Sequence, residues 1–198
     1  MAYDKFGILK STAVPLPIEN VDTDQIIPAR FLKATERKGF GDNLFRDWRY
    51  NSDNTIKEQF VLNNPIYKGK ILVGGKNFGS GSSREHAVWA VYDYGFRCVV
   101  SSFFADIFRG NCLNIGVLPV QVSAEFSDKI FKAIEADPET EIEINLQNQT
   151  ITLLETGEQE LFEINNYKKQ NMLNGYDDID YLTKIKEEIQ DFASKRPF

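Results

Sequence analysis

A glycine- and serine-rich segment, residues 74–87, carries the residue types best suited to chemistry in this chain. It reads GGKNFGSGSSREHA, so one arginine, one glutamate and one histidine stand close to three serines. The apolar run Ile71–Val73 precedes it, and a pattern of helical period, Ala87–Tyr94, follows. A strand, a tight loop and a helix start gather backbone N–H groups at one point, where they favour an anion. We therefore predict an anion-binding loop.

The spacing of the glycines argues against a nucleotide as the ligand. A phosphate-binding loop needs a lysine directly after its last glycine, and none follows Gly79 or Gly81. The dinucleotide fingerprint lacks its third glycine, and the G-x-S-x-G pattern of hydrolases is absent. Arg84, by contrast, has a planar guanidinium that binds a carboxylate at two points. A carboxylate is therefore the ligand that this loop suits best.

Simpler interpretations of the same residues stay open. Ser82 and Glu85 have the spacing of a capping box, so Ser82 can be a helix cap with no further role. His86 can be structural. Asp22 and Asp24 stand two apart in a short segment and would share one face of a strand. A turn or cap is a commoner role for this pair than a metal site without a third ligand.

The elements that must position the loop follow a regular order. Strand and helix alternate with short connections from Ile71 to Val120, which favours parallel strands joined by right-handed crossovers. Before them, Phe6–Val14 is predicted to be one strand. No internal repeat or linker divides the sequence. We therefore expect a single α/β domain over residues 1–198.

The second half of the chain adds a smaller β-structure and a helical end. Residues 141–146 and 150–153 alternate with period two on either side of Asn148-Gln149, which predicts a β-hairpin. The end of the chain, from about 165 to 198, is predicted to be a helical extension.

Composition limits the classes of function. The net charge is −6, and no basic stripe is present, which disfavours nucleic acid as a partner. No apolar run is long enough to span a membrane, and no secretory signal is visible, so we expect the cytoplasm. The two cysteines, Cys98 and Cys112, form no metal-binding pattern with the single histidine. They suggest a reducing compartment, although a single disulfide stays possible.

The loop and several other stretches resemble one known family. Gly81–Ala87 resembles the signature of the swivelling domain of the aconitase superfamily, and Asn20–Pro28 resembles the Asp-Thr-Asp segment near the start of that domain. Further stretches, in the same order from about Phe6 to Phe192, are similar to the bacterial small-subunit family of 3-isopropylmalate dehydratase; they are 40–49, 93–96, 102–108, Asn111, 116–120 and 171–175. This resemblance implies an aconitase-type swivelling β/β/α domain with a mostly parallel central sheet, an extra β-hairpin and C-terminal helices.

The resemblance also implies an activity. Members of the family interconvert 2-isopropylmalate and 3-isopropylmalate through isopropylmaleate, by dehydration and rehydration, in leucine biosynthesis. The family reaction uses a [4Fe–4S] cluster that is held by three protein thiolates. This chain has only two cysteines, so it binds no such cofactor alone. The implied partner is a separate large subunit that carries the cluster, in a heterodimer or a larger assembly.

Roles in the family transfer to matching positions in this sequence. Ser82 matches the catalytic base. The matches to substrate-binding residues are Ser83, Arg84, Asp24, Thr23 and Arg37. The segment Phe31–Phe40 matches the loop that distinguishes substrates, in which Phe31 and Leu32 could receive an isopropyl group. Glu85 and His86 are expected to support the residues that contact substrate. Ser80 stands where relatives often carry cysteine, with little expected consequence.

Other functions remain open at this point. A related hydro-lyase could act on homoaconitate, citraconate or dimethylmalate. A second class is a non-catalytic module that binds a carboxylate or a phosphate. A nucleotide-binding domain is disfavoured by the glycine spacing, and an RNA-binding role by the net charge of −6.

Overall fold

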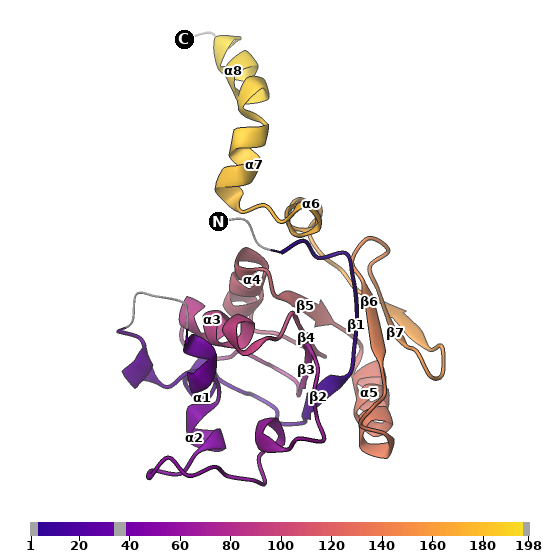
Figure 1. The fold of residues 1–198 in the computed structure, drawn as a ribbon. Coiled ribbons are helices and arrows are strands. Elements are labelled where there is room, and N and C mark those ends of the chain that lie inside the picture. The colour runs from indigo at the N-terminus through magenta and orange to yellow at the C-terminus, as the bar shows by residue number, and fades with distance from the viewer. Residues whose placement is uncertain (1–3, 34–38, 196–198) are drawn as a thin grey trace.

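Two four-stranded sheets form the centre of the computed structural model, which describes residues 4–33 and 39–195. The first sheet is parallel throughout, in the order β2 (Ala13–Leu16), β3 (Ile71–Gly74), β4 (Cys98–Ser101) and β5 (Leu118–Gln121) (Figure 1). This confirms the parallel pairing expected from the alternation of strands and helices. The second sheet is antiparallel, in the order β1 (Ile8–Ser11), β6 (Ile142–Asn145), β7 (Thr150–Leu153) and β8 (Gln159–Leu161).

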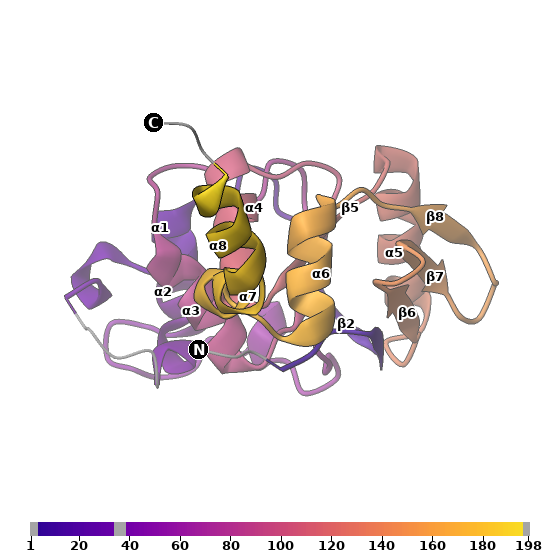
Figure 2. The same ribbon diagram turned by 90° about the horizontal axis from the view of Figure 1, so that it is seen from above.

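The parallel sheet has an apolar layer on each face, which is why its central strands are buried along their whole length. Leu72 and Val99 belong to the core on one face, with residues of α3 (Glu85–Tyr94) and α4 (Asp106–Ile115). Their neighbours Ile71 and Val73 belong to the core on the other face, with α5 (Ala124–Ala136) and the antiparallel sheet. Figure 2 shows these groups on opposite sides of the molecule. The architecture is the β/β/α arrangement that the resemblance implied.

The longer helices end where the sequence predicts. Gly95 and Gly116 follow α3 and α4 in the left-handed conformation, at φ of 114° and 88°, which glycine adopts at low cost. Short helices occupy the first third of the chain; they are α1 (Thr23–Ile26), η1 (Ala29–Phe31), η2 (Phe40–Asn43), α2 (Arg46–Arg49) and η3 (Val61–Asn63). Three further helices follow the second sheet; they are α6 (Asn166–Asn174), α7 (Asp178–Lys184) and α8 (Lys186–Ser194).

The single strand predicted over Phe6–Val14 is wrong, because the chain changes sheet at Thr12. Residues before it pair antiparallel with β6, and residues after it pair parallel with β3. Thr12 is held in this corner by its hydroxyl, which donates to the carbonyl oxygen of Lys68 at 2.6 Å. Gly69 packs so closely there that an added Cβ would lie 2.0 Å from the Thr12 carbonyl oxygen. The predicted hairpin is therefore the middle of a complete four-stranded sheet.

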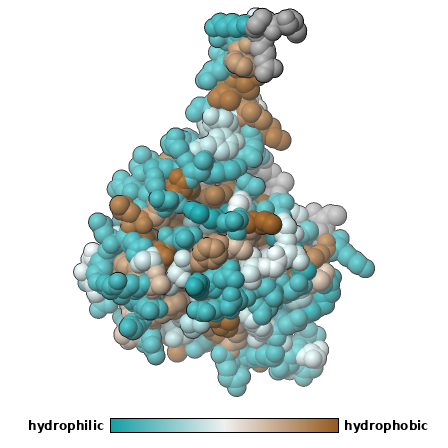
Figure 3. Space-filling model, turned by 180° about the vertical axis from the view of Figure 1, so that it is seen from behind, coloured by the Kyte–Doolittle hydropathy of each residue, from teal (hydrophilic) through white to brown (hydrophobic). Residues whose placement is uncertain are grey.

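The last two helices extend away from the rest of the chain (Figure 1). Neither α7 nor α8 contains a buried residue, and apolar side chains such as Ile179 and Leu182 are exposed along them. Figure 3 shows this extension as a projection with apolar side chains on its surface. Within the described residues, no helix combines the length and apolar character that crossing a membrane requires.

Candidate active site

The loop between β3 and α3 is held by backbone hydrogen bonds to two other segments. On one side, the N–H groups of Gly79 and Ser80 donate to the carbonyl oxygen of Val21 at 2.8 and 3.1 Å. On the other side, the N–H of Phe78 donates to Phe103 at 3.0 Å. Because Val21 lies just before α1 and Phe103 lies between β4 and α4, these bonds fix the path of the loop from the carboxyl end of β3 to the start of α3.

Gly79 permits the closest packing in this loop. Its φ is +78°, and an added Cβ would lie 2.1 Å from the Cγ atom of Phe108 in α4. No other residue type fits both the backbone conformation and the contact. Gly81, at φ of +89°, makes the second left-handed turn, which places Ser82 and Arg84 after it. The glycine-rich character of the loop thus has a steric cause.

The alternative interpretation of Ser82 as the cap of α3 is not supported. The residue before the first turn of α3 is Arg84, in an extended conformation with φ of −136°, and no side chain caps the helix there. Ser82 lies two residues too early to reach the free N–H groups. Its side chain is exposed and has no hydrogen-bond partner among the described residues. The hydroxyl is therefore available for a ligand.

Asp22 carries a capping box instead. Its carboxylate accepts a hydrogen bond from the N–H of Gln25 at 2.8 Å, and its own N–H donates to the Gln25 side chain at 2.9 Å. These bonds start α1 at Thr23, which confirms a cap as the role of Asp22, whereas the expected shared face of a strand is not formed. The buried hydroxyl of Thr23 donates to the carbonyl oxygen of Ser82 at 2.9 Å. Thr23 therefore fixes the backbone at Ser82.

Arg84 and Asp24 form an ion pair with two hydrogen bonds. The Nη2–Oδ2 distance is 2.8 Å, and Nη1 contacts Oδ1. Nη1 also lies 3.5 Å from the carbonyl oxygen of Ile27. The Arg84 side chain is only 13% exposed, whereas that of Asp24 is 53% exposed. The pair joins α1 to the glycine-rich loop and brings together two residues that the sequence singled out.

A cavity of about 240 Å³ separates the loop from α4. Ser82 and Arg84 line one side of it, and the first turn of α4 lines the other. No side chain caps α4, so N–H groups of its first turn have no partner within the helix. They favour a negative charge nearby. The full lining is Thr23, Gly79, Gly81, Ser82, Arg84, Ala105, Asp106, Ile107, Phe108 and Asn111.

The α4 side of this cavity was not predicted from the sequence. The signal was present, because Phe103–Asp106 follows β4, the strand next to β3 in the parallel sheet. Ligands bind beyond the carboxyl ends of such strands, where loops from neighbouring strands meet. Asp106 and Asn111 are the polar side chains that this rule would have added.

The other predicted site residues that the structure describes do not line this cavity. Ser83 is exposed on the loop. Glu85 accepts a hydrogen bond from the Trp89 indole at 3.1 Å, and the His86 ring packs against Trp89 at 4.4 Å between ring centres. These contacts place both side chains in an aromatic cluster beside the site.

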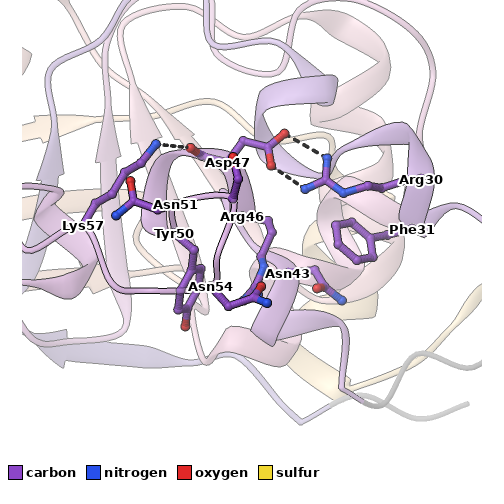
Figure 4. Close-up of a pocket in the computed structure, with 10 residues that line it drawn as sticks. Arg30, Phe31, Asn43, Arg46, Asp47, Tyr50, Asn51, Asn54 and Lys57 are labelled. Carbon is purple, nitrogen blue, oxygen red and sulfur yellow. Dashed lines mark hydrogen bonds and ion pairs between the residues drawn. The ribbon is translucent and has the colours of Figure 1, made fainter.

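The loop predicted to distinguish substrates is only partly described. Arg37 lies outside the described residues. Phe31 lines a different cavity, with Arg30 and Tyr50 (Figure 4), and Leu32 packs half-buried against the core. Phe31 is therefore not brought to Ser82 in this structure.

Neither cysteine belongs to the site. Cys98 in β4 and Cys112 in α4 are buried and form no disulfide. Burial raises the pKa of both thiols well above the ordinary value, because the thiolate is penalised in an apolar surrounding. Among the described residues, no three His, Cys, Asp or Glu side chains gather in a way that could hold a metal ion. These residues do not fit a cluster that needs three thiolates.

Comparison with known proteins identifies the family. A model of the aconitase C-terminal domain matches residues 3–125, and a model described as LeuD_N matches residues 128–166. The 3-isopropylmalate dehydratase small subunit of Cytophaga hutchinsonii is 63% identical over 187 residues, covering 94% of this chain and 93% of the relative. That of Christiangramia forsetii is 59% identical over 193 residues, covering 98% and 94%.

A solved structure agrees with these relatives. The 3-isopropylmalate dehydratase (leuD) of Methanocaldococcus jannaschii superposes with a TM-score of 0.66 at 26% sequence identity, covering 94% of this chain and 99% of that one. The agreement extends over both sheets, because both chains are covered almost completely. On this combined basis, the chain belongs to the family of 3-isopropylmalate dehydratase small subunits, which have the fold of the aconitase C-terminal domain.

Proposed function

We propose that this chain is the small subunit of a 3-isopropylmalate dehydratase, a hydro-lyase that interconverts 2-isopropylmalate and 3-isopropylmalate in leucine biosynthesis. The observation that carries the proposal is the cavity beside the glycine-rich loop. In this cavity, the Ser82 hydroxyl has no hydrogen-bond partner among the described residues, and Asp24 orients the Arg84 guanidinium. The relatives match this chain over nearly their whole length. We place the enzyme in the cytoplasm.

Arg84 is proposed to bind a carboxylate of the substrate. Its two-point contact with Asp24 leaves other N–H groups of the guanidinium available, and a carboxylate oxygen fits their planar geometry. Asp24 then acts as a positioning residue that sets the direction of the guanidinium. Asp24 could also exchange places with the incoming carboxylate, because it is the more exposed partner.

Ser82 is proposed to take the proton from the substrate carbon next to the departing hydroxyl. A neutral serine is a weak base, so the alkoxide form must be stabilised. The first turn of α4 lines the same cavity, and its N–H groups favour a developing negative charge. Thr23 holds the Ser82 backbone through its carbonyl oxygen, which makes Thr23 a positioning residue as well.

The remaining half of the active site is assigned to a partner. The chain's own cysteines are buried and do not fit a cluster, so the [4Fe–4S] group is proposed to reside in a large subunit. When bound there, it would supply a Lewis acid for the substrate hydroxyl. The exposed side chains of Ser82 and Ser83 lie on the face that we expect to meet this subunit. Ser83, Arg37, Phe31 and Leu32 remain proposed substrate contacts in the closed enzyme.

A substrate comparison tests this function. The chain is produced together with the large subunit, and the purified complex is offered 2-isopropylmalate, homoaconitate, citraconate and dimethylmalate in turn. We expect turnover of 2-isopropylmalate to be much the fastest. Turnover of a tricarboxylate with none of 2-isopropylmalate would assign the chain to a related hydro-lyase. No turnover of any acid, with a folded chain that binds carboxylates alone, would favour the non-catalytic module.

A further inference from the structure

A second cavity, of about 730 Å³, lies beside η1 and α2 (Figure 4). It shares no lining residue with the cavity at Ser82. Its volume falls in the range common for small-molecule sites. Its lining is almost entirely polar and consists of Arg30, Phe31, Asn43, Arg46, Asp47, Tyr50, Asn51, Ser52, Asn54 and Lys57.

The charges around this cavity do not balance. Arg30, Arg46 and Lys57 are cationic, and Asp47 is the one carboxylate in the lining, which leaves an excess of two positive charges. This contrasts with the net charge of −6 for the whole chain. Asp53 is close in sequence, but its carboxylate accepts hydrogen bonds from Thr55 and is not part of the lining.

The three cations differ in how far they are neutralised. Arg30 forms a two-point ion pair with Asp47, with Nη1–Oδ2 at 3.0 Å. Lys57 donates only to the backbone carbonyl oxygen of Asp47, at 2.8 Å. Arg46 contacts the Asn54 side chain and lies over the Tyr50 ring, 3.9 Å from its centre. Within the described part of the chain, neither Arg46 nor Lys57 forms an ion pair with a carboxylate, although both are close enough to Asp47 to help lower its pKa.

The wall of this cavity is held in place by the core. Phe45, between Asn43 and Arg46, is fully buried and has a φ of 48°, which is rare for a bulky residue. It keeps this conformation because its ring stacks on Trp48, at 5.4 Å between centres, and its N–H donates to Ile26 at 2.8 Å. Strained residues of this kind persist only where packing fixes them, and they cluster at functional sites. Arg46 therefore projects from a rigid support.

We propose that this cavity is a binding site for a small dianion, either inorganic phosphate or a dicarboxylate. Arg46 and Lys57 supply the two charges that form no ion pair among the described residues, and Arg30 closes one end through its link to Asp47. The asparagine amides around them can donate further hydrogen bonds to anionic oxygens. Binding here requires neither a partner subunit nor turnover.

Calorimetry on the full chain tests the site. The chain is titrated with inorganic phosphate and, separately, with succinate, at constant ionic strength, with acetate as the monoanion control. Arg46→Gln and Lys57→Gln each remove one cation from the cavity, and Lys132→Gln removes one from the exposed surface of α5. We expect one of the two dianions to bind more tightly than acetate. Each cavity variant should weaken it about tenfold or more, and Lys132→Gln should leave it unchanged.

A further variant separates this site from the cavity at Ser82. Arg84→Gln removes the carboxylate-binding group there and should leave dianion binding at the second cavity intact. Loss of binding in Arg84→Gln, with retention in Arg46→Gln and Lys57→Gln, would overturn the proposal. Equal weakening of dianion binding by Lys132→Gln would overturn the proposal too. It would also be overturned if the wild-type chain bound no anion and Lys57→Gln instead weakened binding of the large subunit. Thermal unfolding of each variant shows that the chain is folded during the titration.

Discussion

The carboxylate of Asp24 holds the guanidinium of Arg84 across 60 residues of sequence, with an Nη2–Oδ2 distance of 2.8 Å. This pair connects the first turn of α1 to the residue that precedes α3. It means that the proposed substrate-binding group is oriented before any substrate arrives. The site is thus assembled from two segments of the chain, and the sequence of either segment alone does not predict it.

Removing the Asp24 carboxylate should impair binding more than stability. In Asp24→Asn, the Arg84 side chain loses its two-point partner, so we expect a clear rise in KM with a smaller change in kcat. Because Asp24 is largely exposed, the loss in free energy of unfolding should stay within about 1 kcal/mol. Steady-state kinetics of the two-subunit enzyme and urea unfolding measure the two effects. Glu158→Gln, which breaks an exposed ion pair with Lys129, is the control and should leave KM unchanged.

Two serines should give opposite results on truncation. Ser82 caps nothing in this structure, so Ser82→Ala should leave the free energy of unfolding almost unchanged. Ser123 does cap a helix, because its hydroxyl accepts the Phe126 N–H at 3.1 Å at the start of α5. Ser123→Ala should therefore cost about 1 kcal/mol. Urea unfolding of both variants checks this contrast. A loss in Ser82→Ala as large as in Ser123→Ala would restore a structural role for Ser82.

Two glycines with similar backbone angles separate steric contact from backbone strain. Gly157 has a φ of +74° and open space around it, so Gly157→Ala should cost about 1–2 kcal/mol from the left-handed conformation alone. Gly79 has a φ of +78° and lies against Phe108. Gly79→Ala adds that clash and should cost about 2–5 kcal/mol. Equal destabilisation in urea unfolding would contradict the close packing of the loop on α4.

The two thiols should be inert in the folded chain. The thiolate is the reactive form, and burial raises the pKa of Cys98 and Cys112 while also blocking access. We expect the native chain to react with a thiol reagent such as Ellman's reagent only as fast as it unfolds. The denatured chain should titrate two thiols, which serves as the internal control. Rapid modification of either cysteine at neutral pH would be inconsistent with their buried positions.

Much of the fold follows from local patterns. The apolar run at Ile71–Val73 and the Gly95 stop predicted β3 and the end of α3, because burial and the left-handed cap leave clear signals. The corner at Thr12 leaves no such signal in the sequence, because the residues on both sides of it are compatible with one continuous strand. β1 joins the second sheet because it pairs antiparallel with β6, which follows more than 130 residues later, as the register of Ile8 with Asn145 shows. Tertiary contacts, and not local sequence patterns, determine which sheet such a strand joins.

The site was predictable in its residue types and less so in its geometry. Arg84 stood out because the glycine spacing excludes phosphate motifs and leaves a carboxylate as the suitable ligand, whereas Ser82 was singled out by the family resemblance; both line one cavity. The role of Asp22 as a cap was among the interpretations that the sequence favoured, and its spacing to Gln25 is that of a capping box. The contribution of α4 and the ion pair to Asp24 were not predictable, since they arise from the packing of separate segments. The spacing of Ser82 and Glu85 is that of a capping box, but α3 begins at Glu85, one residue after Arg84, which stands at the N-cap position.

The central claim is that this chain completes an active site in another subunit and supplies Ser82 to it. The most direct measurement mixes a fixed amount of the large subunit with increasing amounts of wild-type chain, of Ser82→Ala chain, or of both, and follows turnover of 2-isopropylmalate. We predict that the wild-type chain restores turnover and that the Ser82→Ala chain does not, while lowering turnover in mixtures by competing for the partner. Turnover close to wild type with the Ser82→Ala chain alone would contradict the account.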